Sequence, residues 1–272
     1  MILPATSAGA VDPLPSYVAL GDSYTAGPLI PLQEQPYGCL RSTNNYPKMV
    51  APSLGLARFR DVSCSGADTA DMTKPQGVTP GPNPPQFDAL DAGTRIVSIQ
   101  IGGNDIGFSS IAQDCFSPTP LGSPCQDAYV VNGRDEISER IAAAGPLVGA
   151  AFAGIKVRAP NARVFALNYP AIFPEDGGLT CWPQLPIATA DIPYLRAKQK
   201  ELNDMVAAQA AANGAILVDV YTPSIGRDAC SVPVLRWVEP VVVVNAAAPV
   251  HPNLTGMQGM AAVLKTAIAA NP

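Results

Sequence analysis

Short apolar runs, each ended by glycine, proline or polar residues, recur along this chain. Runs of β-branched and apolar residues that stop in this way are typical of buried strands. The first run begins at Tyr17 and breaks at Gly21, and the same pattern then recurs along the chain. It predicts strands at residues 17–20, 57–62, 95–101, 163–169 and 215–220.

Other segments place apolar residues three and four positions apart, which is the spacing of amphipathic helices. The two longest are residues 136–157 and 194–213, and the second is followed by Gly214, a common helix end. Shorter helices are predicted at residues 45–53 and 255–269.

The remaining long segments lack a regular pattern. Residues 73–85 are crowded with proline and glycine and are predicted to form a loop. Residues 171–193 form a long irregular segment, and loops of this length in a compact domain often carry function. Residues 109–132 show no strong period.

Strands that alternate with helices predict a parallel sheet, because each crossover helix must return over the sheet before the next strand. We therefore expect an α/β fold, a three-layer α/β/α sandwich with a five-stranded parallel sheet. No linker divides the 272 residues, so we expect a single domain over residues 1–272. Residues 1–15 are predicted to be an extended N-terminal segment.

The composition favours a compact, acidic protein. Charged residues make up 14% of the chain and hydrophobic residues 47%, which favours a folded core over disorder. The net charge is −5, and lysines and arginines are scattered singly, so no basic stripe offers a nucleic-acid site. No uninterrupted apolar run reaches the roughly 18 residues that span a bilayer. We expect a soluble protein with no nucleic-acid partner.

Candidate chemistry first appears at Gly21-Asp22-Ser23, directly after the first predicted strand. In an α/β sheet, ligands bind beyond the carboxyl ends of the strands, where backbone N–H groups at the start of the next helix point outward. Ser23 is expected at such a position. Alternatively, the tripeptide is an ordinary turn in which Asp22 or Ser23 caps a helix.

The chain contains one histidine, His251. A serine hydroxyl becomes a good nucleophile only when a positioned base takes its proton, and imidazole has the pKa best suited to that task near neutral pH. Any mechanism that pairs serine with histidine must therefore use His251. A solitary histidine can equally be a structural residue.

A third candidate segment, residues 101–106, follows the predicted strand at 95–101 and reads Ile-Gly-Gly-Asn-Asp-Ile. The side-chain amide of Asn104 can donate a hydrogen bond to a developing oxyanion, and the glycines allow a substrate to approach the backbone closely. The same residues are also common in turns.

Taken together, these segments resemble the SGNH (GDSL-like) hydrolases. The resemblance extends over residues 17–256, and its four segments occur in the family's order: residues 21–27, 63–67, 102–105 and 251–252. It implies that Ser23 is the nucleophile and His251 the base. It also implies an oxyanion hole made by the backbone N–H groups of Ser23 and Gly66 and the side-chain amide of Asn104, with no cofactor.

The chain departs from the family at one position. The family usually has an aspartate three residues before the histidine, and this chain has Ala248 there. That third member normally holds the imidazole in the right tautomer and stabilises the imidazolium. A backbone carbonyl is thought to serve instead in the secreted actinobacterial members that this chain resembles. We hypothesise a Ser23–His251 dyad whose third partner is the main-chain carbonyl of Ala248.

Six cysteines lie in loop-like settings: Cys39, Cys64, Cys115, Cys125, Cys181 and Cys230. They could be reduced core residues, but an even set in turns favours disulfides and an oxidising compartment. Cys115 and Cys125 bracket a loop rich in proline and glycine and are predicted to bridge it. The resemblance implies the further pairs Cys39–Cys64 and Cys181–Cys230.

A metal site is not expected, because the chain has no Cys-x-x-Cys motif and one histidine. The first ten residues lack the basic region and long apolar core of a signal peptide, although their small residues are typical of the surroundings of a cleavage site. We expect a secreted, extracellular protein, and we expect this sequence to start near the N-terminus of its mature form.

The leading hypothesis is a serine esterase or lipase that hydrolyses acyl esters of the lipid or phospholipid type, acting as a monomer and contacting a lipid interface transiently. Apolar residues in loops near the predicted site suit acyl chains, although they could also be core: Leu29, Ile30, Leu32, Phe116, Leu121, Trp182, Leu185, Ile187, Trp237 and residues 241–244.

Two alternatives stay open. A carbohydrate ester deacetylase would use the same site, and nearby loops also carry the polar residues Tyr37, Asn44, Asn83 and Gln184. A catalytically degenerate binding protein would explain the missing aspartate. An α/β-hydrolase is disfavoured, because no Gly-x-Ser-x-Gly motif occurs.

Overall fold

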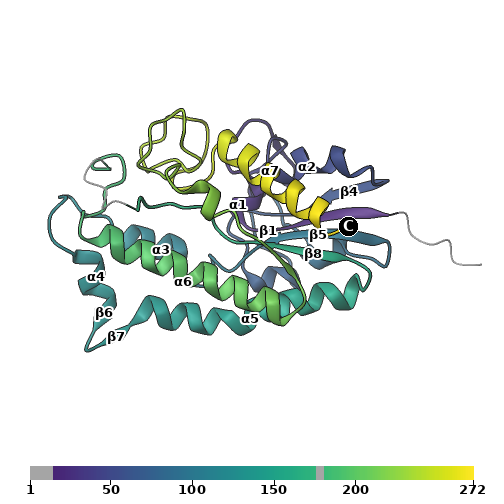
Figure 1. Ribbon diagram of the computed structural model, residues 1–272, viewed down its shortest axis with the longest axis horizontal. Helices are drawn as coiled ribbons and strands as arrows, with labels where there is room; N and C mark the ends of the chain where they lie inside the picture. Colours follow the sequence, from purple (N-terminus) through teal and green to yellow (C-terminus); the bar gives the residue numbers. More distant parts are fainter. Residues whose placement is uncertain (1–14, 176–180) are drawn as a thin grey trace, which may run out of the picture.

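A five-stranded parallel sheet forms the centre of the computed structural model, which describes residues 15–175 and 181–272. Its strand order is β4-β1-β5-β8-β9 (Figure 1). The bounds are Ser16–Gly21 for β1, Arg58–Asp61 for β4, Thr94–Gln100 for β5, Arg163–Leu167 for β8 and Ile216–Val218 for β9. The predicted strands and the predicted α/β fold are thus confirmed. Of the predicted N-terminal segment, residues 1–14 lie outside the described residues.

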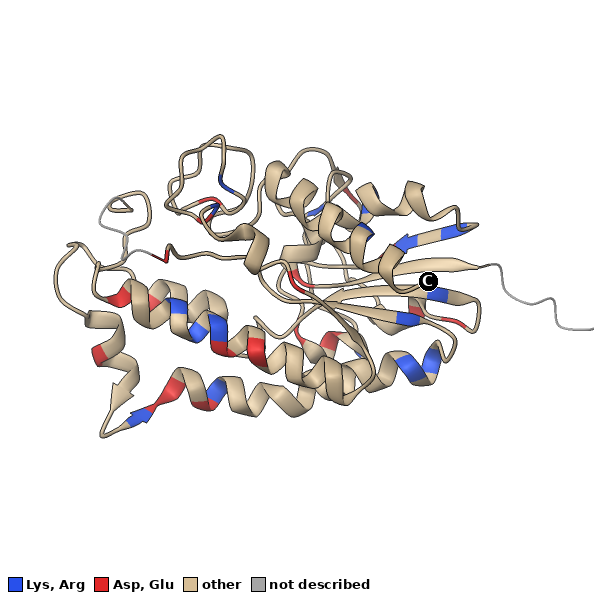
Figure 2. Ribbon diagram, in the orientation of Figure 1, with Lys and Arg blue, Asp and Glu red and all other residues tan. Residues whose placement is uncertain are grey.

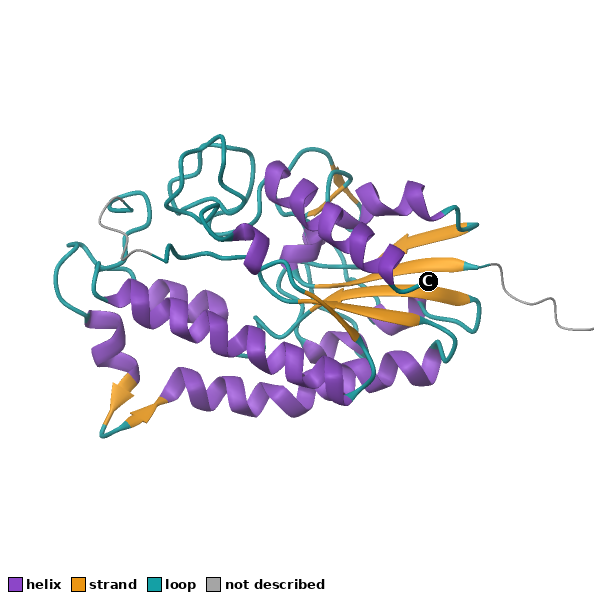
Figure 3. Ribbon diagram, viewed as in Figure 1, coloured by secondary structure: helices purple, strands orange, loops and turns teal. Residues whose placement is uncertain are grey.

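Helices cover both faces of the sheet (Figure 3). Helices α2 and α7 lie over one face, and α5 and α6 over the other (Figure 1). Their bounds are Tyr46–Val50 for α2, Leu254–Ala270 for α7, Glu136–Arg158 for α5 and Asp191–Ala212 for α6. A strand covered on both faces buries every residue, and β1 does so along its whole length.

Alternate residues of β1 enter different cores, since successive side chains of a strand point to opposite faces. Tyr17 and Ala19 pack in the cluster that contains Met257 and Leu264 of α7. Val18 and Leu20 pack in the cluster that contains Val148 and Phe152 of α5. The sheet is therefore the middle layer of three.

Three helices differ from the sequence prediction. Helix α6 begins at Asp191, inside the segment expected to be irregular, and so includes Pro193. Proline is tolerated there because the first-turn N–H groups of a helix have no partner within the helix. Residues 109–132, for which no element was predicted, contain most of α3 (Phe108–Asp114) and all of α4 (Pro124–Tyr129). These helices are too short to show a clear period.

The other elements are short. They comprise α1 (Ser23–Ala26), two hairpins formed by β2 (Gln33–Glu34) with β3 (Arg41–Ser42) and by β6 (Val130–Val131) with β7 (Arg134–Asp135), and 3-10 turns at Tyr37–Cys39, Ala51–Leu54, Thr69–Met72, Gln86–Ala89 and Thr222–Ser224. The predicted loop at residues 73–85 contains one isolated bridge, between Gln76 and Asn83.

Among the described residues, α5 is the one helix whose length and apolar composition would allow it to cross a membrane. It runs along α6, and Val148, Phe152 and Ile155 are buried under the sheet. A core helix of a globular protein passes the same test, so packing against the sheet accounts for this composition.

Three disulfides join Cys39 to Cys64, Cys115 to Cys125 and Cys181 to Cys230, the pairing that spacing and resemblance indicated. The first links the segment after α1 to the turn after β4. The second closes the loop between α3 and α4. The third links the two long irregular segments that precede α6 and α7.

Candidate active site

Ser23 is the first residue of α1 and lies just past the carboxyl end of β1, an inner strand of the sheet. The turn between them requires glycine at position 21, where φ is +141° and a Cβ would overlap the carbonyl oxygen of Gln100. The side-chain amide of Gln86 accepts from the Gly21 N–H at 2.7 Å and donates to the Gly21 carbonyl at 2.9 Å. The backbone that carries Ser23 is therefore held on both sides.

The imidazole of His251 contacts Ser23. Its Nε2 lies 2.8 Å from the Ser23 Oγ, and its Nδ1 lies 2.7 Å from the carbonyl oxygen of Pro249. A carbonyl can only accept, so Nδ1 carries the proton and Nε2 is left to accept from the serine hydroxyl. Burial lowers the pKa of His251 below its ordinary 6.5, against a smaller opposing effect of the Pro249 carbonyl. The imidazole is therefore neutral near pH 7, as a general base must be.

The carbonyl that holds the ring belongs to Pro249, so the prediction of Ala248 was wrong by one residue. Val250 has a φ of +59°, which turns the chain back between Pro249 and His251. The Ala248 carbonyl instead accepts the backbone N–H of His251 at 3.2 Å. The group that contacts Nδ1 is nevertheless a main-chain carbonyl.

The loop that carries His251 is anchored by Glu239, whose side chain is completely buried. The carboxylate accepts from the Val244 N–H at 2.9 Å and the Asn253 amide at 2.7 Å, and the Glu239 backbone N–H donates to the His251 carbonyl at 3.0 Å. Burial alone would raise the pKa of Glu239, but the hydrogen bonds, led by that of Val244, lower it below its ordinary value. This carboxylate thus holds the loop and does not contact the imidazole.

Two tyrosines link the Ser23 segment to its neighbours. The Tyr24 hydroxyl donates to the Val250 carbonyl at 2.7 Å, next to His251. The Tyr169 hydroxyl donates to Asp22 at 2.5 Å and accepts the Gly103 N–H at 2.9 Å. Burial raises the pKa of Asp22 from 3.8 to about 7, although the bond from Tyr169 opposes this. These contacts join the segments 21–27 and 102–105 to each other and to Val250, the residue before His251.

Sequence reasoning treated Asp22 as a turn residue and did not single out either tyrosine for the site. Tyr169 lies just past the carboxyl end of β8, at the same sheet edge as Ser23. Tyr169 could have been identified from the sequence, because it places a hydroxyl group at the end of a predicted strand. Asp105, also assigned to a turn, accepts from the backbone N–H and the hydroxyl of Thr69.

The predicted oxyanion donors reach the same region. The Asn104 amide donates to the carbonyl of Ala67 at 2.8 Å, which links it to the turn of Gly66, where φ is +81°. An amide nitrogen carries two hydrogens, so Asn104 has a second donor to offer. Within the described residues, the backbone N–H groups of Ser23 and Gly66 make no hydrogen bond to the protein. Among the described residues, these two N–H groups and the second Asn104 hydrogen therefore remain free to donate.

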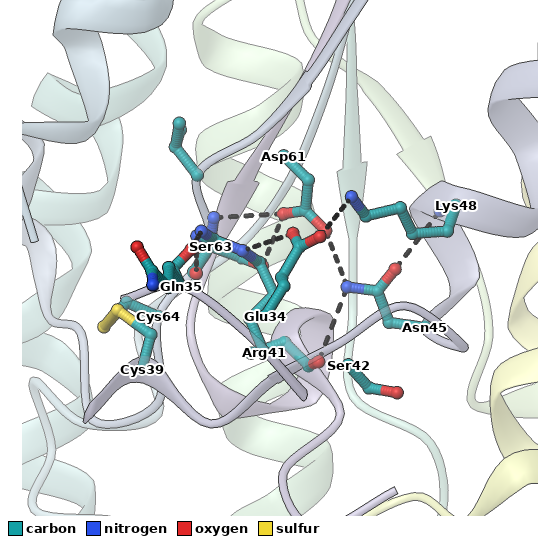
Figure 4. A network of polar contacts seen from close by, with 12 residues as sticks. Glu34, Gln35, Cys39, Arg41, Ser42, Asn45, Lys48, Asp61, Ser63 and Cys64 are labelled. Atoms are coloured by element: carbon teal, nitrogen blue, oxygen red, sulfur yellow. Dashed lines mark hydrogen bonds and ion pairs between the residues drawn. A yellow bond between two sulfur atoms is a disulfide. The ribbon is translucent and has the colours of Figure 1, made fainter. Parts of the chain in front are cut away.

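A polar network holds the turn of Gly66 in place (Figure 4). Arg41 donates to the Ser63 carbonyl at 2.7 Å and pairs with Glu34 at 2.9 Å. Asp61, at the end of β4, accepts from the Ser63 hydroxyl and the Asn45 amide, both at 2.6 Å. Burial raises the pKa of Asp61, although the Arg41 guanidinium opposes this. The network and the adjacent Cys39–Cys64 disulfide fix the turn to the sheet.

An apolar pocket lies against Ser23, Asn104 and Val250. Its walls come from α3, α5, α6 and the irregular segments that flank residues 176–180. The apolar lining residues are Ile106, Phe108, Ile111, Ala112, Phe116, Ile137, Ile172, Phe173, Leu185, Ile187, Leu195 and Leu202. Lys198 also lines the pocket, but its ammonium group is paired with Asp135 and Glu201 at 2.8 Å each.

Some of the residues that were predicted to lie near the site line the pocket, and others do not. Of the predicted apolar residues, Phe116, Leu185 and Ile187 line it, and the others do not. None of the polar residues that favoured a sugar ester lines it: Tyr37, Asn44, Asn83 and Gln184. Helix α3, which was not predicted, supplies Phe108, Ile111 and Ala112. Among the described residues, no group of three or more His, Cys, Asp and Glu side chains could hold a metal ion.

The chain is similar to known proteins over most of its length. It matches the GDSL-like Lipase/Acylhydrolase family over residues 19–258. It is 44% identical to Lipase 2 of Streptomyces coelicolor over 257 residues, which cover 92% of this chain and 84% of the relative. It is 32% identical to a lipase of Streptomyces rimosus over 216 residues, which cover 79% of this chain and 73% of that lipase.

Solved structures of similar fold include two from Streptomyces. The extracellular lipase of Streptomyces rimosus superposes with a TM-score of 0.77 at 29% identity, covering 93% of this chain and 99% of that one. Phospholipase A1 of Streptomyces albidoflavus superposes with a TM-score of 0.72 at 24% identity, covering 96% of this chain and all of that one. The second likeness shows the shared fold alone.

Proposed function

Because the chain belongs to the GDSL-like lipase/acylhydrolase family and is a carboxylic ester hydrolase, we propose that Ser23 is its nucleophile and His251 its general base. One observation carries this assignment: the 2.8 Å contact between the His251 Nε2 and the Ser23 Oγ. The two residues are 228 positions apart in sequence, so their contact is a product of the fold.

In this proposal the Ser23 Oγ attacks the ester carbonyl while its proton passes to the His251 Nε2. The imidazolium that forms is stabilised by the Pro249 carbonyl at Nδ1–H. The oxyanion of the tetrahedral intermediate accepts hydrogen bonds from the Ser23 and Gly66 N–H groups and the Asn104 amide. The alcohol leaves with the proton from His251, and water, deprotonated by the same residue, then releases the acid from the acyl-enzyme.

The substrate class follows from the pocket. A mostly apolar lining beside Ser23 suits the acyl chain of a lipid ester, and burial of each CH₂ contributes about 0.8 kcal/mol to binding. The polar residues that would favour an acetylated sugar lie outside this lining. We therefore propose acyl esters of the lipid type as substrates and place their acyl chain between α3 and α6. The site is complete within one chain, which is consistent with a monomer.

Chain-length preference tests this assignment. On p-nitrophenyl esters of rising length, kcat/KM is expected to be higher for medium and long chains than for acetate. Ala112→Phe narrows the pocket and is expected to lower kcat/KM for the octanoate by about tenfold or more, because two to three buried CH₂ groups are lost. Acetate hydrolysis should change by less than about twofold.

Ala208→Phe, on α6 but outside the pocket lining, provides the matched control and should leave the chain-length profile unchanged. If the wild type instead prefers acetylated sugars to every p-nitrophenyl ester in the series, the result would support a carbohydrate ester deacetylase.

Asn104→Ala is expected to lower kcat by about 10²–10³-fold, the usual effect of losing one oxyanion donor. Asn104→Asp keeps the shape of the side chain but removes the N–H donors, so it should lose as much or more. KM for a short ester should change little, because the donors act on charge that develops in the transition state. A decrease in kcat of less than about threefold in both variants would show that Asn104 is not an oxyanion donor.

Secretion is supported by the three disulfides, which persist in oxidising compartments, and by the extracellular lipase among the similar structures. We propose an extracellular location on these two grounds. Detection of the oxidised protein in the culture medium of its source would test it.

A further inference from the structure

The loop that leads to His251 exposes apolar side chains and buries its charges. Figure 2 marks few charged positions along this loop. Between residues 229 and 250 they are Arg236 and Glu239, whose exposed fractions are 6% and 0%. The large exposed side chains in the same stretch are all apolar: Val232, Val234, Leu235, Val242, Val243 and Val244, with Val234 82% and Val244 65% exposed. This arrangement reverses the usual one, in which charged residues face the solvent.

The exposed residues form two turns that lie side by side. The Asn245 amide donates to the Pro233 carbonyl at 3.0 Å, which joins the turn at 232–235 to the turn at 242–244. Arg236 donates to the Ser231 carbonyl at 2.9 Å, and Glu239 accepts the N–H of Val244. We call residues 232–235 and 242–244 the apolar platform. Its shape is fixed from within by the polar side chains of the same loop.

The platform is continuous with the candidate active site. The backbone N–H of Val242 donates to the carbonyl of Gln184 at 3.1 Å, and the next residue, Leu185, lines the pocket. Glu239 joins the platform to the base: its carboxylate accepts the N–H of Val244, and its backbone N–H donates to the His251 carbonyl. A surface seated on the platform would therefore lie beside the base and the pocket.

We propose that the apolar platform docks on the uncharged surface of aggregated lipid ester, which rests on the proposed function. A contiguous exposed apolar patch marks an interaction surface. A protein partner would need hydrogen-bond groups along the rim, and the polar side chains of Arg236, Glu239 and Asn245 bond within the loop instead. A charged surface is not matched, because the platform exposes no charge and the chain carries a net charge of −5. Hydrocarbon at a neutral lipid interface fits all three observations.

The test places charges on the platform. The double variant Val234→Asp, Val243→Asp alters two exposed side chains, and Val157→Asp on α5, 79% exposed, is the matched control. Each is made with Ser23→Ala for co-sedimentation with phosphatidylcholine vesicles, and with Ser23 intact for hydrolysis of monomeric p-nitrophenyl acetate. The double variant should bind vesicles about tenfold or more weakly and hydrolyse acetate within about twofold of wild type. The control should match the parent in both assays.

Vesicle binding of the parent should also persist in high salt, because apolar insertion is not screened. Equal vesicle binding by the double variant, or no binding by the parent, would overturn the proposal. A parent dimer that the double variant splits in analytical ultracentrifugation would assign the face to a second copy instead. Absence of acetate hydrolysis by the wild type, with Ser23 intact, would count against the proposed function and not against the platform.

Discussion

Ser23→Ala is expected to lower ester turnover by at least about 10⁴-fold and to abolish covalent labelling by an organophosphonate. The alanine side chain has no oxygen to attack the carbonyl, so the acyl-enzyme cannot form. Residual turnover would come from the oxyanion donors and the pocket alone. Single-turnover kinetics with a p-nitrophenyl ester and mass spectrometry after phosphonate treatment measure the two effects.

Ser65→Ala is the matched control. Its hydroxyl is buried close to Gly66 and has no hydrogen-bond partner among the described residues, so its removal should change turnover by less than about threefold. Wild type should be labelled at Ser23, whereas a degenerate binding protein would not react. Full turnover by purified, folded Ser23→Ala would refute the assignment of the nucleophile.

His251→Ala is expected to cost about 10³–10⁴-fold or more in kcat, because no other imidazole exists in the chain to take the serine proton. In wild type, kcat/KM should fall as the pH drops through the pKa of His251, since protonated Nε2 cannot accept the proton. Burial lowers this pKa, so the midpoint should lie below 6.5 and activity should persist in mildly acidic buffer. A pH–rate profile on a short ester measures whether kcat/KM falls at low pH and at which pH the midpoint lies.

The same mechanism predicts that no carboxylate acts as a third member. Asp219→Asn should leave turnover within about threefold of wild type, since Asp219 bonds to Asn168 and the turn that follows β9. Glu239→Gln should lower the stability, because an amide nitrogen would face the N–H donor of Val244. A folded variant at either position that loses several orders of magnitude in kcat would contradict the main-chain partner.

Much of this arrangement could be predicted from local sequence. An apolar run that stops at glycine marks both a strand and its carboxyl end, and parallel strands bring those ends to one edge. Ser23, Gly66 and Asn104 each follow such a run, so their convergence could be inferred before any coordinates. The single histidine then left one choice of base.

The remaining features depend on contacts that local sequence does not encode. The choice of Pro249 over Ala248 depends on the positive φ of Val250, a residue type that rarely adopts it. The bond from Tyr169 to Asp22 joins residues 147 positions apart. Helix α3 has seven residues, too few to show a helical period, and yet it supplies a wall of the pocket.

The separation of Ser23 and His251 makes hydrolysis a reporter of completed folding. β1 is an inner strand that needs both β4 and β5 beside it, and the base arrives in the loop before the last helix. Such long-range closures are slow compared with helix formation. During ribosomal synthesis, a nascent chain can therefore assemble its sheet and still be inactive until the loop of His251 has emerged. Recovery of turnover after dilution from denaturant should accordingly lag behind recovery of the far-ultraviolet circular dichroism.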